Sequence, residues 1–346
     1  MKSDIPNEIY AGVAEESLSI EVTTRCNSAC SYCFARAGIS RESSLPVDLV
    51  KEIIAEGFQA SYRQLHITGG EPLLWDGLFE SLEYAFVSGY KRVLLNTNGT
   101  LLTSNVINGL KVYDGLVLSV SLQGSTKTHE RMRGEGSYGR TIKGVERALE
   151  SGLSLLIYTV VGKTLLAELA RYVDDLYKRF PEIQHLSLIQ LIRVTNDVFD
   201  LSHELLDPED FILLVKTVSL LNLFGLKTDV MNNPLAGVTA KVLGTPWISR
   251  SKPLHHPGSL IVMANRDICL AHSSRDGFGK YRPGMIREVL ASNTYQRAVS
   301  SDESTCGSCL YVDLCRAGGM DRPSEWFRDM HPETPYCKRV LDRASR

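Results

Sequence analysis

The sequence lacks the features that would direct the chain to a membrane or to nucleic acid. Its longest apolar runs, around Leu116–Leu122 and Leu153–Val161, are far shorter than the roughly 20 residues of a membrane span. The first residues lack the apolar segment of a signal peptide. The formal net charge is only −2, so no strong basic field attracts nucleic acid. We therefore expect a cytoplasmic protein with no nucleic-acid partner and no membrane partner.

A small basic group at the end of the chain does not change this expectation. The predicted solvated face of a C-terminal helix consists of Lys338, Arg339, Arg343 and Arg346.

Cysteine is absent from the whole middle of the chain. Three of the eight cysteines lie within Cys26–Cys33, and the other five lie from Cys269 onward. In a reducing compartment, cysteines bind metal or take part in catalysis more often than they form disulfides. The distribution predicts two separate cysteine sites, one near each end of the chain.

Strand and helix patterns alternate through the first half of the chain. The predicted strands cover residues 19–23, 64–68, 92–95, 116–122, 153–161 and 185–191. The predicted helices between them cover residues 46–62, 78–87, 104–110, 141–150 and 165–180. Strands that alternate with helices pair in parallel through right-handed crossovers. Because six such units are too few for a closed barrel, we predict an α/β fold with a partial (β/α)6 TIM-like barrel. Its active site should lie at the carboxyl ends of the strands.

The length of the chain favours a main domain with an appendage. We predict the partial barrel over residues 1–191, a connecting, substrate-covering region over 192–259 and a small cysteine-rich domain over 260–346. The middle region contains one predicted helix, over 208–224, and loops rich in proline and glycine. Its alternative interpretation is a packed linker.

The first cysteine group directly follows the first predicted strand. Cys26, Cys30 and Cys33 have the spacing C-x3-C-x2-C. Three thiolates on one tight loop can bind a 4Fe–4S cluster and leave one iron without a protein ligand, as catalytic metal sites require. Structural zinc is the alternative, but it takes four ligands, and the nearest further candidate is His66.

With the aromatic Tyr32 directly before its last cysteine, this motif resembles the cluster loop of the radical S-adenosylmethionine (SAM) superfamily. The resemblance implies that SAM binds the open iron of the cluster. It also implies that SAM is cleaved to a 5′-deoxyadenosyl radical, which abstracts hydrogen from a substrate. A reducing electron donor such as flavodoxin or ferredoxin is implied as a partner.

A segment after the second predicted strand resembles the GGEP motif of the same superfamily. Its residues are Thr68, Gly69, Gly70 and Glu71, followed by Pro72. The two glycines let the backbone approach a ligand closely, and we expect the segment to contact SAM. In isolation, the same residues would be interpreted as a simple turn.

Two further segments resemble SAM-binding motifs of the superfamily. Asn96 begins the segment Asn96–Gly99 after the third strand, where an ordinary Asn-Gly turn is the alternative. Ser121 and Arg133 belong to an S-x-D-G…H-x-x-x-R-G pattern, and both are candidates for the SAM carboxylate. The alternative for Arg133 is an exposed loop residue. Gln123 replaces the Asp of this pattern, which leaves the local hydrogen bonding open.

The second cysteine group lies near the end of the chain. It contains C-x2-C-x5-C and one distal cysteine, namely Cys306, Cys309, Cys315 and Cys337. By spacing alone, four thiolates fit zinc or an iron–sulfur cluster equally well. The segment resembles the SPASM domain or its shorter relative, the twitch domain, and this resemblance implies an auxiliary 4Fe–4S cluster.

Two positions limit this second resemblance. Gly319 stands where the full SPASM pattern has a further cysteine, so we predict one auxiliary cluster rather than two. Cys269 is left over, and we expect it to be a buried structural thiol. A substrate-site role or an unusual ligand role is the alternative.

Enzymes with such a C-terminal domain mostly modify peptides, and others act on small cofactor or porphyrin precursors. The resemblance therefore implies a peptide or protein maturase that crosslinks, epimerises or oxidises its substrate. An oxidase or lyase of a small-molecule precursor is the alternative, and a non-enzymatic iron–sulfur or zinc protein would not explain the GGEP segment. Leu270 after Cys269 disfavours formylglycine formation, because the members that catalyse it have an Asp there.

Only 18 residues precede the strand predicted at 19–23. We therefore expect that any leader peptide is bound by a separate protein or by the 192–259 region. Polar and aromatic groups of that region that could bind a peptide are Arg193, Asn196, Asn232, Asn233 and Trp247. The sequence identifies neither the substrate nor a catalytic acid or base.

Overall fold

The computed structural model describes most of the chain. The described residues are 17–33, 35, 37, 38, 40–193, 200–245, 248, 255–272, 277–299, 309–315 and 336–346. Of the residues discussed above, those outside this set are Cys306, Gly319, Asn196 and Trp247.

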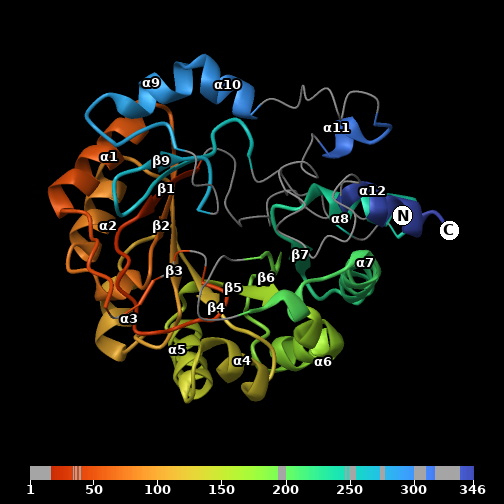
Figure 1. Ribbon diagram of the computed structural model, residues 1–346. Helices are drawn as coiled ribbons and strands as arrows, with labels where there is room; N and C mark the ends of the chain where they lie inside the picture. Colours follow the sequence, from red (N-terminus) through yellow and green to blue (C-terminus); the bar gives the residue numbers. More distant parts are fainter. Residues whose placement is uncertain are drawn as a thin grey trace.

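The six predicted strands are all present, and they pair in parallel in chain order, which confirms the predicted partial barrel (Figure 1). They are β1 (Ser17–Glu21), β2 (Gln64–Thr68), β3 (Arg92–Thr97), β4 (Leu116–Ser121), β5 (Ser154–Val161) and β6 (His185–Gln190). Because the strands run in parallel, their carboxyl ends meet at one edge of the sheet.

Three short strands extend the sheet beyond the prediction. β7 (Thr228–Val230) pairs in parallel with β6, so the segment predicted to be irregular adds a strand to the barrel. β8 (Leu260–Val262) pairs in parallel with β1, and β9 (Ile268–Cys269) pairs antiparallel with β8. The described residues form one sheet in the order β7-β6-β5-β4-β3-β2-β1-β8-β9.

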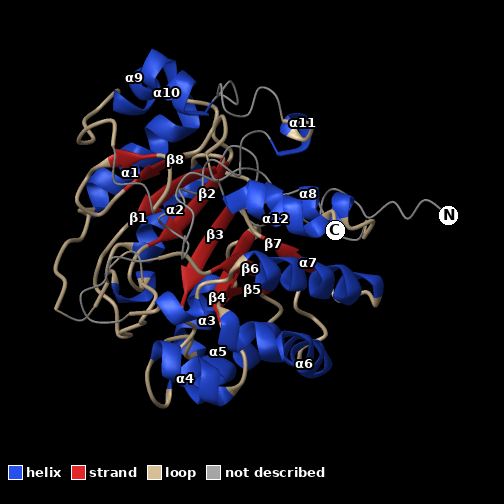
Figure 2. Cartoon of the chain, turned by 45° about the vertical axis from the view of Figure 1, so that its right-hand side comes forward, coloured by secondary structure: helices blue, strands red, loops and turns tan. Residues whose placement is uncertain are grey.

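Helices cover the outer face of the sheet (Figure 2). They are α1 (Val47–Gln59), α2 (Leu78–Val87), α3 (Ser104–Leu110), α4 (Thr126–Arg133), α5 (Ser137–Glu150) and α6 (Lys163–Arg179). Alternate strand residues such as Leu18 and Ile20 belong to the core between sheet and helices. Because side chains alternate along a strand, Ser19 and Glu21 face the interior of the barrel.

The later helices lie after β6. They are α7 (Pro208–Leu223), α8 (Pro234–Val242), α9 (Met285–Ala291), α10 (Asn293–Val299), α11 (Val312–Cys315) and α12 (Tyr336–Ala344). The described residues also contain two short 3-10 helices, η2 (Pro72–Leu74) and η3 (Ser202–Glu204). α12 packs against α7 and α8. The expectation of a fully solvated α12 face is wrong for Arg339, which is only 9% exposed and lies 5.7 Å from the centroid of the Tyr336 ring.

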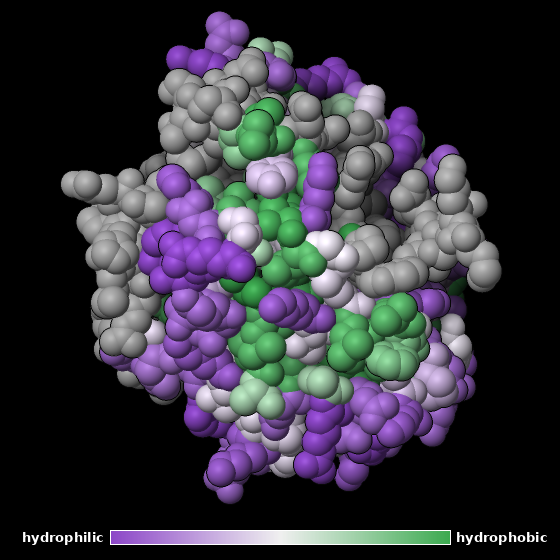
Figure 3. Space-filling view, turned by 90° about the vertical axis from the view of Figure 1, so that its right-hand side faces the viewer, coloured by the Kyte–Doolittle hydropathy of each residue, from purple (hydrophilic) through white to green (hydrophobic). Residues whose placement is uncertain are grey.

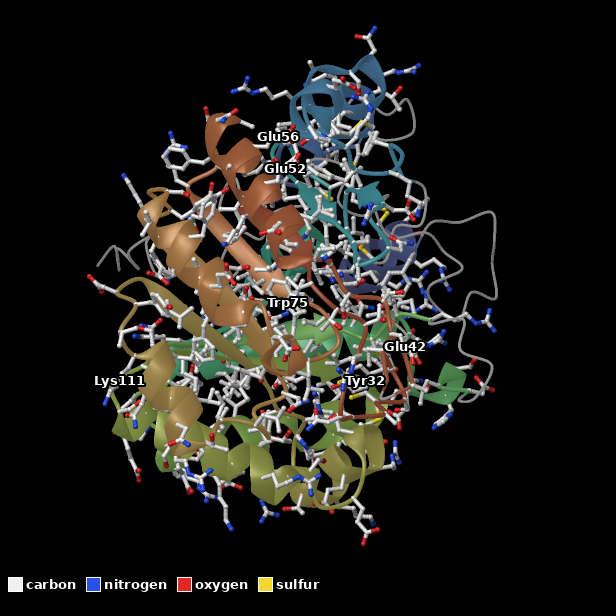
Figure 4. All side chains as sticks on the ribbon, turned by 90° about the vertical axis from the view of Figure 1, so that its left-hand side faces the viewer. Tyr32, Glu42, Glu52, Glu56, Trp75 and Lys111 are labelled. Atoms are coloured by element: carbon white, nitrogen blue, oxygen red, sulfur yellow. The ribbon has the colours of Figure 1, made fainter. Side chains whose placement is uncertain are left out.

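Glu56 of α1 joins the C-terminal segment to the barrel. This buried carboxylate accepts hydrogen bonds from the Tyr281 hydroxyl (2.8 Å) and from the backbone N–H groups of Ile286 (2.7 Å) and Gly284 (3.2 Å). Figure 4 shows Glu56 where α1 meets the C-terminal segment. A carboxylate at the first turn of α9 satisfies N–H groups that have no partner within that helix.

α7 carries apolar residues on its outer side as well as in the core. The exposed ones, including the residue that follows the helix, are Leu213, Leu220, Leu223 and Phe224. Figure 3 shows apolar side chains at the surface on the side of the molecule where α7 and α12 lie. No helix within the described ranges is long and apolar enough to cross a membrane.

Candidate active site

The first three cysteines lie on a loop that leaves β1 and folds back on itself before α1. The backbone N–H of Thr24 donates to the Ser43 carbonyl (2.8 Å), and the N–H of Leu45 donates to the Val22 carbonyl (2.9 Å). The indole N–H of Trp75 donates to the carbonyl of Leu45 (3.0 Å). Both ends of the loop are therefore fixed to the sheet, so the cysteines between them are held in a braced segment.

The cysteines of this loop lie close to one another. Cys26 is buried, Cys30 and Cys33 are half-buried, and the N–H of Cys33 donates to the Cys30 carbonyl (3.2 Å). Burial, together with the nearby Glu71, Cys30 and Cys33, raises the pKa of the Cys26 thiol to about 11, although a backbone hydrogen bond from Ser28 opposes this shift. Burial also raises the pKa of Cys33. Neighbouring thiolates repel one another. A positively charged metal centre stabilises them and deprotonates its thiol ligands.

The spacing of these thiols bears on the choice between zinc and a cluster. Within the described part of the chain, no three Cys, His, Asp or Glu side chains converge on a point that would suit a single metal ion. A zinc ion needs its ligands at about 2.0–2.3 Å, whereas each iron of a cluster takes its own thiolate. His66, the nearest candidate for a fourth zinc ligand, is on β2 with its Nδ1 3.2 Å from Ser19 Oγ. The residues present therefore fit a cluster better than zinc.

The Gly-Gly segment after β2 packs directly against the cysteine loop. The N–H of Gly70 donates to the Thr23 carbonyl (2.7 Å), and the N–H of Glu71 donates to the Arg25 carbonyl (2.8 Å). A Cβ atom at Gly70 would lie 2.2 Å from the Arg25 carbonyl oxygen. The loop carrying Cys26 therefore sits against the end of β2 only because residue 70 has no side chain.

Glu71 connects the ends of β2 and β3. It is fully buried and accepts hydrogen bonds from the Thr97 hydroxyl (2.9 Å), the Asn98 N–H (2.7 Å) and the Leu73 N–H (3.1 Å). Burial raises the pKa of this carboxyl, and these hydrogen bonds oppose that effect. The side chain thus holds two neighbouring strand ends together below the cysteine loop, and contact with SAM stays a prediction.

Asn98 reaches the cysteine loop from the end of β3. Its Nδ2 atom lies 2.7 Å from Asn27 Oδ1, 3.4 Å from Ser28 Oγ and 4.0 Å from Cys26 Sγ. The sequence singled out the Asn96–Gly99 segment but assigned its contact to Asn96. Only the packing of β3 against the loop identifies Asn98 as the residue beside the thiol.

The buried Arg133 pairs with the half-buried Tyr32 of the cysteine loop. Arg133 ends α4, is only 8% exposed, and donates from Nη1 to the Tyr32 hydroxyl (2.5 Å). Tyr32 is labelled in Figure 4. Burial alone lowers the pKa of Arg133, but Tyr32 and Cys30 outweigh it and raise that pKa. The guanidinium is therefore a buried cation beside the cysteines, and the exposed-loop alternative for Arg133 is wrong.

The remaining predicted residues line the ends of β2, β3 and β4. Asn96 Nδ2 lies 3.5 Å from Thr68 Oγ1, and the Ser119 hydroxyl donates to Asn96 Oδ1. Ser121, the last residue of β4, is half-buried. These side chains lie at neighbouring strand ends, as the motif positions predicted, and their contact with SAM stays a prediction.

Gln123 has a bracing role that the sequence left open. Its Oε1 atom accepts from the Val160 N–H (2.7 Å), and its own N–H donates to His129 Nδ1 (3.2 Å). The amide therefore ties the segment after β4 to β5. A carboxylate at this position could accept the Val160 N–H equally well, but it would bring a buried negative charge.

The structure describes three of the four cysteines of the second group. Cys309 is exposed, Cys315 ends α11, and Cys337 lies in the first turn of α12, with both latter residues half-buried. The helices that carry Cys315 and Cys337 both pack against α8. Because Cys306 is outside the described residues, the four-ligand set stays a prediction. Cys269 on β9 is 2% exposed, which confirms that it is a buried thiol.

Three groups predicted to bind peptide can be placed. Asn232 is half-buried between β7 and α8, and its contact with a peptide stays a prediction. Asn233 is fully buried, and its Nδ2 atom donates to Gln190 Oε1 (3.0 Å). The expectation that this amide pairs with a peptide is therefore wrong, because it is enclosed at the start of α8. Arg193, in contrast, is exposed after β6.

Comparison with known proteins supports this arrangement. The model of the radical SAM superfamily matches residues 20–176. The AdoMet-dependent heme synthase of Methanosarcina barkeri is 34% identical over 161 residues, which cover 46% of each chain. The mycofactocin maturase MftC of Mycobacterium tuberculosis is 24% identical over 324 residues, which cover 88% of this chain and 78% of that protein. This chain thus spans about half the length of the heme synthase and more of the maturase.

Solved structures share the fold across nearly the whole chain. A structure of anSMEcpe with bound AdoMet superposes with a TM-score of 0.73 at 16% identity, covering 95% of this chain and 91% of that one. SuiB of Streptococcus suis, bound to the precursor peptide SuiA, gives a TM-score of 0.68 at 17% identity, covering 93% and 76%. At such identities the likeness establishes the fold alone.

The braced cysteine loop and the family match together define the class of protein. Residues 20–176 are a radical SAM domain. The three cysteines of the C-x3-C-x2-C motif lie within this domain, on the loop between β1 and α1.

Proposed function

We propose that the protein reductively cleaves SAM at a 4Fe–4S cluster held by Cys26, Cys30 and Cys33, and that it matures a peptide or protein. When bound, the cluster and SAM would supply a 5′-deoxyadenosyl radical that abstracts a hydrogen atom from the substrate. The observation that carries the proposal is the loop itself, where three clustered thiols lie between Asn98 and the buried Arg133. We further propose that the buried guanidinium of Arg133 would bind the SAM carboxylate.

The choice of a peptide rests on the relative whose alignment covers most of both chains. The alignment with a mycofactocin maturase covers most of both chains, whereas those with the heme synthase and with GTP 3′,8-cyclases cover about half. Two structures of similar fold contain a peptide. These likenesses favour crosslinking, epimerisation or oxidation of a peptide over other reactions of the class.

A small-molecule precursor is the second candidate substrate. The heme synthase and the GTP cyclase of Helicobacter pylori are 34% and 31% identical over 161 and 170 residues, which is 46% of this chain in each case. Both are named for reactions of small molecules. An oxidase or lyase of a cofactor or porphyrin precursor is therefore the alternative function.

The C-terminal cysteines support an auxiliary 4Fe–4S cluster of the SPASM or twitch type. Its ligands would be Cys306, Cys309, Cys315 and Cys337, and we propose that residues 260–346 form this domain. A flavodoxin or ferredoxin would deliver electrons to the first cluster. A separate protein that binds a leader peptide is a further proposed partner.

The test is an anaerobic assay of the reconstituted enzyme with SAM, dithionite and the peptides encoded beside its gene. Mass spectrometry should detect 5′-deoxyadenosine and a peptide product whose mass shows hydrogen loss or another change. Turnover of a small precursor with no change in any peptide would replace the maturase proposal with the alternative function.

A further inference from the structure

Three titratable side chains from distant parts of the sequence meet inside the barrel. Glu21 ends β1, His66 lies in β2, and His272 follows β9 by three residues. The Nδ1 atom of His272 is 3.6 Å from Glu21 Oε2, and the His66 and His272 rings lie edge to face with centroids 6.4 Å apart. None of these residues takes part in the contacts that brace the cysteine loop.

The register of β1 and β2 places Glu21 and His66 on the interior face of the sheet. Ser19 pairs with His66, and Glu21 pairs with Thr68. The intervening Ile67 packs in the core between sheet and helices, so the residues on either side of it face the opposite way. Glu21 lies at the carboxyl end of its strand, which is where partial barrels carry out their chemistry.

One carboxylate oxygen of this group is buried and lacks a hydrogen bond. Glu21 is 3% exposed, and its Oε1 accepts from the Ala264 N–H (3.1 Å), but its Oε2 has no hydrogen-bond partner within the described residues. His66 is 5% exposed, and its ring interacts with Ser19 Oγ and with the Asn96 side chain. Buried polar atoms are almost always satisfied in folded proteins, so the unpaired Oε2 of Glu21 points to a missing ligand.

His272 is the most exposed of the three side chains. It keeps 19% of its surface exposed, whereas Glu21 and His66 are buried. Burial, and then the neighbouring His272, lowers the pKa of His66 to about 3, so that ring is neutral near pH 7. The carboxylate of Glu21 therefore receives no positive charge from His66.

We propose that Glu21, His66 and His272 form a subsite that binds a hydrogen-bond-donating side chain of the substrate. An amine, a guanidinium or a hydroxyl would donate to Glu21 Oε2, and a second donor hydrogen or a hydroxyl oxygen would pair with an imidazole. A substrate carboxylate is excluded because it would meet a buried carboxylate. The inference rests on the proposed peptide substrate and adds to it the chemistry of one residue next to the site of modification.

A double-mutant cycle between enzyme and peptide tests this subsite. The enzyme carries Glu21→Gln, and in the peptide each donor residue is replaced in turn, Lys by norleucine or Ser by Ala. One donor residue of the peptide should be the residue that occupies the subsite. For that residue, the enzyme change alone and the peptide change alone should each lower kcat/KM about tenfold to a hundredfold. The two changes together should lower kcat/KM no further than either one alone. The control variant is Glu150→Gln, an exposed carboxylate at the end of α5, which should match the wild type.

Two results would overturn the subsite. One is that the effects of Glu21→Gln and of every peptide change simply multiply, since independent effects mean no contact. The other is that Glu21→Gln and the second variant, His272→Gln, both fold but lose iron, which would place the group in cluster binding. If the wild type modifies no peptide but converts a small precursor, the peptide proposal fails. The same cycle with the amine or hydroxyl of that precursor methylated then decides the subsite separately.

Discussion

Replacement of Gly70 by alanine tests whether the end of β2 positions the cluster loop. The new Cβ would lie 2.2 Å from the Arg25 carbonyl oxygen, and backbone atoms cannot move aside as a flexible side chain can. Relief of this clash requires the loop to shift away from β2. The shift would weaken the Gly70–Thr23 and Glu71–Arg25 backbone hydrogen bonds of 2.7 and 2.8 Å. Overpacking costs about 1–3 kcal/mol and each of the two hydrogen bonds about 1 kcal/mol, so we expect a loss of roughly 3–5 kcal/mol at the loop.

The consequence should appear in the cluster before it appears in the fold. After anaerobic reconstitution, Gly70→Ala should retain about four fewer irons per chain than the wild type, while circular dichroism shows a folded barrel. The matched control is Gly139→Ala, because a Cβ at this exposed position of α5 meets nothing within 4 Å. That control should keep its iron. Full iron content and full SAM cleavage in Gly70→Ala would show that the contact does not position the loop.

Three further predictions follow from buried charges. Arg133→Lys keeps the charge but loses the planar fork of the guanidinium, so the KM for SAM should rise about tenfold. The KM is measured from 5′-deoxyadenosine formation at a series of SAM concentrations. An unchanged KM would show that Arg133 does not bind SAM. Glu56→Gln should lower the free energy of unfolding, measured in urea, by about 2–4 kcal/mol. The reason is that the hydrogen bonds from Tyr281 and from the start of α9 lose a charged acceptor. The control Glu52→Gln, at an exposed position of the same helix, should leave the free energy of unfolding unchanged. Burial lowers the pKa of His129 to about 3 from its ordinary 6.5, so below pH 6.5 only the unfolded chain takes up this proton, and stability should fall by about 2 kcal/mol from pH 6.5 to pH 5. That fall should be smaller in His129→Asn, and an equal fall in both proteins would contradict the assignment.

The barrel was predictable because its strands and helices are long enough to show their periods. β5, for example, extends over Ser154–Val161, and the sequence predicts a strand over 153–161. β7, β8 and β9 contain two or three residues each, which is too short for a period to be recognised. Their places are decided by pairing with β6 and β1, across long separations in sequence. α4 was missed because its residues were interpreted as parts of a motif rather than as a capped helix beginning after Ser125.

The motifs of the site were predictable from the sequence, but the contacts that each residue makes were not. The GGEP segment was expected to approach SAM, and in the structure its Gly70 also approaches the cysteine loop. The Asn96–Gly99 segment was identified, whereas the contact with Cys26 belongs to Asn98. Glu21 carried no signal at all, because its environment is built by His66 and His272 from distant parts of the sequence. Spacing along a chain identifies ligands on one loop, and only packing identifies groups that meet across strands.

The most direct test of the account compares the wild type with a variant in which Cys26, Cys30 and Cys33 are all replaced by alanine. The wild type should bind roughly eight irons per chain in two clusters and should release 5′-deoxyadenosine from SAM under dithionite. The triple variant should keep roughly four irons, held by the C-terminal cysteines, and should release none. Reductive cleavage of SAM by the triple variant at the rate of the wild type would contradict the central claim that this loop holds the catalytic cluster.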